Sequence, residues 1–99
     1  MAKFALLVRL DAKTGKEREV EAFLRSALPL VQAETGTRSW YALKMAPEIF
    51  GIFDTFDDEA GRNAHLSGKV AAALMEKASD LLSRPPVIEK IEILTAKDG

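Results

Sequence analysis

The chain of 99 residues contains no cysteine and a single histidine, His65. Without cysteine there are no disulfide bonds, thiolate metal sites or cysteine nucleophiles. A lone histidine cannot form a two-imidazole metal site such as HExxH. The serines lie in no GxSxG context, and no glycine-rich phosphate loop is present, which argues against a hydrolase or a nucleotide-binding protein. We therefore expect no metal ion and no cofactor.

Charge of one sign and long apolar runs are also missing. The formal net charge is -1 and the signs are interspersed, so neither nucleic acid nor a membrane surface is an expected partner. The apolar run from Phe4 to Val8 is too short for a signal peptide or a membrane span. We expect a soluble cytoplasmic protein. Apolar residues make up 47% of the chain, which is enough for one folded domain over residues 1–99.

The hydrophobic pattern predicts the order strand, helix, strand, strand, helices, strand. The predicted strands cover residues 4–11, 37–45, 49–56 and 87–96, with a turn at Ala46 and Pro47 between the middle two. This order is typical of the ferredoxin-like split βαβ fold. The fold class is therefore α+β, with a four-stranded antiparallel sheet and helices on one face.

Helix ends are predicted from capping residues and from proline. Thr14 and Glu17 have the spacing of a capping box, so the first helix should begin there. Pro29 should kink this helix, and Gly36 should end it. Asp57 is expected to cap a short helix over residues 58–66. A further helix follows and should end before Pro85 and Pro86. One face of it carries Val70, Ala73, Leu74, Lys77, Ala78 and Leu81.

The sheet face away from the helices is expected to be apolar. It should carry either Ala5, Leu7 and Arg9 or the alternate set of the same strand, and the candidates beside it are Gly51, Phe53, Ile91 and Ile93. Such a face is unusual on a monomer of this size, so we expect a homodimer in which two sheets pack face to face. The alternative is a monomer with a mildly apolar sheet.

His65 and Asp54 are the candidate reactive residues. A carboxylate that meets the His65 ring would fix its tautomer and raise its pKa. The alternative is an ordinary half-buried histidine bonded to a backbone carbonyl. Asp54 interrupts the apolar segment GIFDTF, so it lies either at a solvated strand end or in a cavity. In a cavity, burial would raise its pKa and make it a base or a partner of His65.

Aromatic residues are the candidate walls of a ligand site. Trp40 and Tyr41 are adjacent in one strand and point to opposite faces, but strand parity does not decide which faces inward. Core packing would account for either one. The helix over residues 58–66 has few large apolar groups, so a cavity lined by His65, Phe56 and a strand aromatic is expected over the sheet.

The segments AKTGKEREVEAFL, ETGTRSWYAL and FDTFDDEAGRNAHLSGKVAAAL resemble the antibiotic biosynthesis monooxygenase family. In that family a strand ending in an aromatic and an acidic turn leads to a helix with an AHL step, which Phe56, His65 and Leu66 match. The resemblance covers residues 3 to 96. It implies a dimeric α+β barrel, with a pocket between the sheet and the helices of each subunit.

The resemblance also implies a cofactor-independent monooxygenase of a quinol or polyketide-like aromatic substrate. His65 or Asp54 would accept the phenolic proton, and Trp40, Tyr41 and Phe56 would supply stacking walls. The alternative is a non-catalytic module that binds small aromatic ligands on the same dimeric barrel.

Haem degradation, another activity of the family, is disfavoured. Val8, Phe56 and residues 71–73 stand where haem-degrading members carry an asparagine, a tryptophan and a histidine. Many members also carry a second histidine where Val70 stands here.

Overall fold

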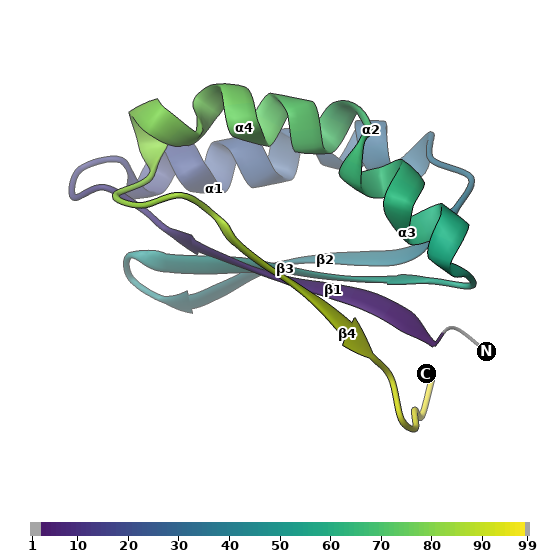
Figure 1. Ribbon diagram of the computed structural model, residues 1–99. Helices are drawn as coiled ribbons and strands as arrows, with labels where there is room; N and C mark the ends of the chain where they lie inside the picture. The colour runs from purple at the N-terminus through teal and green to yellow at the C-terminus, as the bar shows by residue number, and fades with distance from the viewer. Residues whose placement is uncertain (1–2, 99) are drawn as a thin grey trace.

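A sheet covered on one face by helices forms the protein, as described for residues 3–98 by a computed structural model (Figure 1). The strands are β1 (Phe4–Asp11), β2 (Thr37–Ala46), β3 (Ile49–Phe56) and β4 (Val87–Glu92). The helices are α1 (Glu17–Ser26), α2 (Leu28–Gln32), α3 (Glu59–Leu66) and α4 (Lys69–Leu81). The strands pair antiparallel in the order β2-β3-β1-β4, which confirms the predicted α+β, ferredoxin-like fold.

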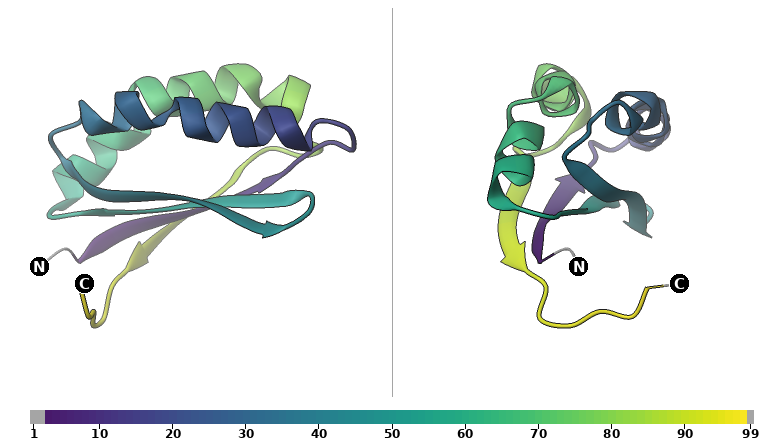
Figure 2. Two further views of the ribbon diagram at one scale, coloured as in Figure 1. Left: turned by 180° about the vertical axis from the view of Figure 1, so that it is seen from behind. Right: turned by 90° about the vertical axis from the view of Figure 1, so that its right-hand side faces the viewer.

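Alternation along the strands separates a helix-covered face from an uncovered one. In β1, Leu6, Val8 and Leu10 are buried beneath the helices, while Leu7 and Arg9 lie on the opposite face. The long helices α1 and α4 lie side by side over the sheet (Figures 1 and 2). The short helix α3 slopes from the end of β3 up to the start of α4. Figure 2 also shows that no helix covers the lower face within the described residues.

Trp40 faces the helices, and Tyr41 faces the uncovered side. Trp40 packs against both hydrophobic clusters beneath the helices. Tyr41 is 55% exposed and stacks on Phe53 across the β2–β3 pair, with ring centroids 6.4 Å apart. The choice that strand parity left open is therefore decided by the bulk of the indole, which fills the space under the helices. The larger cluster consists of Val8, Leu10, Ala12, Val20, Leu24, Phe50, Ile52, Leu74, Leu81 and Leu82.

The predicted capping box at the start of α1 is wrong. Lys16 occupies the N-cap position and makes no side-chain cap. Gly15 has a positive φ of 91°, a conformation that glycine adopts readily, and its N–H donates to the Glu17 carboxylate at 2.8 Å. This turn leaves Thr14 outside the helix, where its hydroxyl donates to Glu48 at 3.3 Å.

Asp58, and not Asp57 as predicted, caps α3. The Asp58 carboxylate accepts the N–H of Gly61 at 2.7 Å, which satisfies one of the free donors of the first turn. β3 stays extended to Phe56, so Asp57 still belongs to the turn. The Asp57 carboxylate instead accepts from Arg38 on β2 at 3.3 Å.

In place of the expected kink at Pro29, the helix is interrupted at one residue, Ala27, which itself keeps helical φ and ψ angles of -75° and -19°. α1 ends at Ser26, and Pro29 falls in the first turn of α2, where its missing N–H is not needed.

The last strand, β4, is shorter than predicted. It ends at Glu92 because Glu92 pairs with Phe4, the first residue of β1. The last contact beyond the pair is the N–H of Ile93 with the carbonyl of Lys3 at 2.7 Å. Among the described residues, none of the helices combines the length and apolar character that crossing a membrane requires.

Candidate functional site

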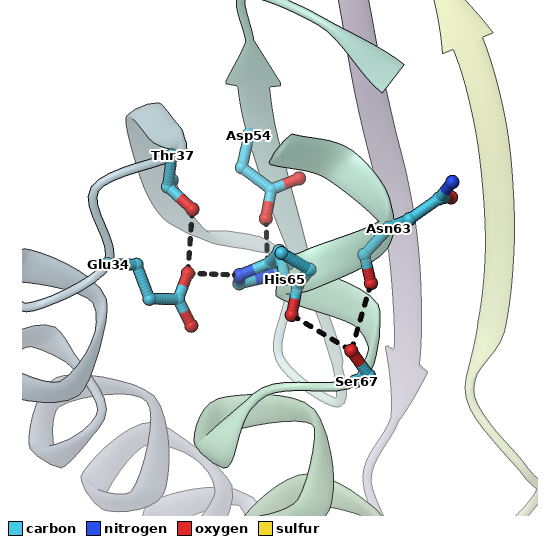
Figure 3. A network of polar contacts seen from close by, with 7 residues as sticks. Glu34, Thr37, Asp54, Asn63, His65 and Ser67 are labelled. Carbon is cyan, nitrogen blue, oxygen red and sulfur yellow. Dashed lines mark hydrogen bonds and ion pairs between the residues drawn. The ribbon is translucent and has the colours of Figure 1, made fainter. Parts of the chain in front are cut away.

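The His65 ring lies between two carboxylates (Figure 3). Its Nε2 atom is 2.9 Å from Oδ2 of Asp54, and its Nδ1 atom is 2.5 Å from Oε1 of Glu34. The side chain of His65 is 8% exposed and that of Asp54 is fully buried. The contact between Asp54 and His65 was one of the alternatives left open by the sequence, and the structure contains it. Glu34 was not singled out.

The three residues come from three parts of the chain. Asp54 lies on the helix-covered face of β3, beside Trp40 of β2. Glu34 lies in the connection between α2 and β2, and Thr37 donates its hydroxyl to Oε1 of Glu34 at 2.6 Å. His65 lies in the last turn of α3. The same glutamate oxygen therefore meets both the threonine hydroxyl and the imidazole.

Two glycines allow the Glu34 and His65 segments to approach this closely. A Cβ atom on Gly36 would lie 2.9 Å from the Cα of Gly61, and one on Gly61 would lie 2.8 Å from the carbonyl oxygen of Gly36. Real Cβ atoms do not tolerate such contacts. Backbone contact between the connection and α3 therefore places the carboxylate within reach of the ring.

Arg62 fixes α3 from its other side. Its buried guanidinium donates from Nη1 to the carbonyls of Ala5 at 3.3 Å and Ile91 at 3.2 Å. The same guanidinium lies over the Phe4 ring, 5.2 Å from its centroid. Because Phe4 and Ala5 belong to β1 and Ile91 belongs to β4, Arg62 holds α3 to these two strands.

The two carboxylates raise the pKa of His65. Burial alone would lower that pKa, because it penalises the charged ring. The hydrogen bonds to Asp54 and Glu34, together with the charges of these carboxylates, outweigh burial and hold the pKa above 6.5. With an acceptor beside each ring nitrogen, the arrangement favours the doubly protonated imidazolium.

Each carboxylate has a buried oxygen without a partner among the described residues, Oε2 of Glu34 and Oδ1 of Asp54. Oδ2 of Asp54 meets only Nε2 of His65, at 2.9 Å and outside good hydrogen-bond alignment. A buried unpaired acceptor costs free energy unless it meets a donor, a proton or a water molecule. The site therefore has unused capacity to accept hydrogen bonds.

A cavity of about 390 Å³ opens beside this cluster. Its wall includes Leu30, Ala33, Glu34, Ala64, His65 and Lys69. It lies between the α2–β2 connection and the start of α4, not over the sheet as predicted.

The predicted aromatic walls are not brought together at this cavity. Phe56 is fully buried and its ring lies 5.4 Å from that of His65, centroid to centroid, but it does not line the cavity. Trp40 borders a second hollow of about 280 Å³, which Glu34 also touches. Tyr41 lies on the opposite face of the sheet. Phe56 is buried against His65 and Trp40 packs on both hydrophobic clusters, so both rings belong to the core beneath the helices.

The cluster has the geometry of an acid–base network and not of a metal centre. The imidazole separates the two carboxylates, so the three side chains do not converge on one point, and residues 3–98 contain no group suited to holding a metal ion. Glu34 was the residue that sequence reasoning missed. Its available signal was an acid three residues before the start of the strand that pairs with the strand of Asp54.

Known structures share this architecture. The NE2512 protein of unknown function from Nitrosomonas europaea is 60% identical, with a TM-score of 0.96 over 100% of this chain and 96% of that one. Rv0793 from Mycobacterium tuberculosis is 16% identical, with a TM-score of 0.84 over 98% of this chain and 100% of that one.

A second Nitrosomonas europaea protein, described as a "putative antibiotic biosynthesis monooxygenase", is 17% identical, with a TM-score of 0.82 over 94% and 91% of the two chains. No family model and no curated protein matches the sequence. The identities to Rv0793 and to the second Nitrosomonas europaea protein are this low, so these two likenesses establish the fold alone. The identity to NE2512 goes further: the chain belongs to the same family as that protein.

Proposed function

We propose that the protein is a cofactor-independent monooxygenase of a small electron-rich aromatic, such as a quinol or a polyketide-like phenol. The observation that carries the proposal is a buried histidine held between two carboxylates beside a cavity of about 390 Å³. A fold shared with a protein described as a monooxygenase supports the same reaction class.

Proton acceptance is the contribution that these side chains can make. A phenolic hydroxyl that loses its proton to the carboxylate–histidine network becomes an electron-rich anion. Such an anion reduces O₂ more readily than the neutral phenol does. In the overall reaction of a quinol, one oxygen atom enters the ring, the other leaves as water, and the substrate supplies the electrons. The apolar part of the cavity wall, from Leu30, Ala33 and Ala64, reduces the contact of the bound anion with water.

Oxygen consumption with a panel of quinols and phenols tests this proposal, with mass spectrometry of the products. We expect turnover by the native chain and a reduction of roughly 10²–10⁴-fold in His65→Ala, as for the loss of an acid–base group. Glu76→Gln, on the exposed surface of α4, is the control. Failure of every substrate to raise oxygen consumption above that of the buffer would remove the proposal.

A binding module without chemistry is the second candidate. One observation favours it: both ring nitrogens of His65 are already engaged by carboxylates, so neither is free for a substrate. Saturable binding of aromatic ligands without oxygen consumption would identify this function.

We also propose that two copies pair through the uncovered sheet face. Leu7, Tyr41, Met45 and Val87 are 37%, 55%, 52% and 45% exposed, and the strand register places them on one sheet face. No helix of the described residues covers this face (Figure 2). Large apolar groups gathered on one face mark an interaction surface, and a two-fold axis buries the same patch on both copies.

Sedimentation of Phe53→Asp tests this pairing. Phe53 is half-buried beneath Tyr41 at the centre of the face, so an aspartate there should release monomers at micromolar concentration. Met75→Asp introduces the same charge at an exposed apolar residue of α4, and should leave the dimer intact. Equal sedimentation of both variants, or a monomeric native chain, would refute the pairing.

A further inference from the structure

We propose that Glu34 is the residue that accepts the proton of a bound ligand, and that this ligand is a neutral hydroxyaromatic molecule. The ligand class rests on the proposed function. The assignment of Glu34 rests on the geometry of the cluster, which distinguishes it from the other two members.

Only Glu34 both lines the cavity and keeps an unpaired oxygen. Asp54 has an unpaired oxygen, but it is fully buried and lines none of the cavities described here. His65 lines the cavity, but each of its ring nitrogens meets a carboxylate. The Glu34 side chain is also the most exposed of the three, at 20% compared with 8% and 0%.

The Glu34 carboxylate is oriented by the bonds to one of its oxygens. Oε1 accepts from the Thr37 hydroxyl and contacts Nδ1 of His65. Oε2 points away from both partners, toward the start of α4 (Figure 3). There it lies beside Gly68, where a Cβ atom would be only 3.1 Å from Oε2. Gly68 also lines the cavity, and any side chain at this position would press against the free oxygen.

The free atom determines the chemistry of the ligand. Oε2 is an acceptor, so its partner has to be a donor, and a deprotonated carboxylate or phosphate has no proton to offer. A phenolic hydroxyl does. In the transfer, the ligand O–H bond breaks and an Oε2–H bond forms, so the negative charge moves from Glu34 to the ligand oxygen. No electron pair leaves the ligand in this step, and His65 keeps its protons.

The binding of 4-fluorophenol, followed by ¹⁹F NMR, tests this assignment. In Glu34→Gln the amide oxygen can still accept from Thr37 and His65, but the atom in place of Oε2 becomes a donor. We expect this variant to bind 4-fluorophenol about tenfold more weakly or worse, because an acceptor for the hydroxyl is lost. The probe 4-fluoroanisole, which has no hydroxyl, should bind the native chain and the variant equally. Glu76→Gln, which removes a charge away from the cavity, should bind like the native chain.

Gly68→Ala supplies a second test that leaves every charge in place. Its methyl group would lie 3.1 Å from Oε2, and 3.2 and 3.3 Å from the carbonyl oxygens of Ala64 and His65, so it would crowd Oε2 and 4-fluorophenol binding should weaken here too. Thermal unfolding establishes that each variant is folded, and if Glu34→Gln is not, Gly68→Ala decides. Undetectable 4-fluorophenol binding to the native chain, or equal binding by the native chain and the folded variants, would overturn the assignment.

The assignment and the oxygenase proposal can fail separately. Glu34-dependent binding without oxygen consumption by any quinol would retain the role of Glu34 and remove the oxygenase. Oxygen consumption that Glu34→Gln leaves unchanged would retain the oxygenase and remove the role of Glu34.

Discussion

The titration of His65 is the measurement that the structure constrains most directly. It is the chain's single histidine, so its ring protons give one unambiguous set of NMR signals. We expect a midpoint above 6.5, because hydrogen bonds and charge from Asp54 and Glu34 outweigh the effect of burial. Each unit of elevation corresponds to about 1.36 kcal/mol of preferential interaction with the charged ring.

The raised pKa fixes the sign of a stability change. Between about 6.5 and the raised value, the folded chain holds a proton that the unfolded chain has released. The stabilisation by the ion pairs is therefore complete below about 6.5, and is lost as the pH rises through the folded-state pKa. A single linked proton limits this loss to about 1.4 kcal/mol per pH unit. Urea unfolding at a series of pH values measures the slope.

Asp54→Asn is the perturbation that isolates one partner. The amide retains the shape of the side chain but removes a charge 2.9 Å from Nε2, so the midpoint of His65 should fall. Removing one member of a buried ion pair costs about 3–5 kcal/mol, and we expect about 3 because Glu34 still faces the ring. This cost should apply below the titration of His65 and decrease above it.

Two results would refute this reasoning. One is a native midpoint at or below 6.5, which would mean that burial outweighs the carboxylates. The other is an Asp54→Asn midpoint no lower than that of the native chain, which would mean that the short contact carries no charge interaction. Asp57→Asn, an exposed acid outside the cluster, should leave the midpoint unchanged.

Two further substitutions test how α3 is built and positioned. Gly61→Ala should destabilise the fold by about 1–2 kcal/mol in urea unfolding, because the cost of overpacking against Gly36 exceeds the gain in helix propensity. It should also return the His65 midpoint toward 6.5, and a stabilised variant would contradict the close contact. Asp58→Ala should cost about 1 kcal/mol through the lost cap, whereas Asp57→Ala should change the free energy of unfolding by less than about 0.5 kcal/mol. Equal effects of these two alanines in urea unfolding would contradict the assignment of the cap.

Periodicity was sufficient to predict the fold because it reports which side chains are buried. The alternation in residues 4–11 and the helical spacing from Val20 to Val31 survive in the structure as the faces of β1, α1 and α2. Helix starts were less predictable. A cap depends on the φ and ψ angles of one residue, and the positive φ of Gly15 moved Thr14 out of position.

The candidate site was predictable only in part. Asp54 was notable as an acid within an apolar strand, and a contact with His65 was an explicit alternative. Glu34 could not be deduced, because its contact depends on a backbone approach between Gly36 and Gly61 that no local pattern specifies. Strand alternation puts Trp40 and Tyr41 on opposite faces, and long-range packing decided which of them lies beneath the helices.

The contact between the two glycines has a consequence for how the site can be inherited. The spacing of Glu34 and His65 is set by the radii of backbone atoms and not by the fit of side chains. Core substitutions that change volume elsewhere can therefore accumulate without altering that spacing. A larger residue at either glycine would separate the pair at once. Gly36 and Gly61 are thus expected to be retained, or lost, together with the acid and the histidine in descendants of this chain.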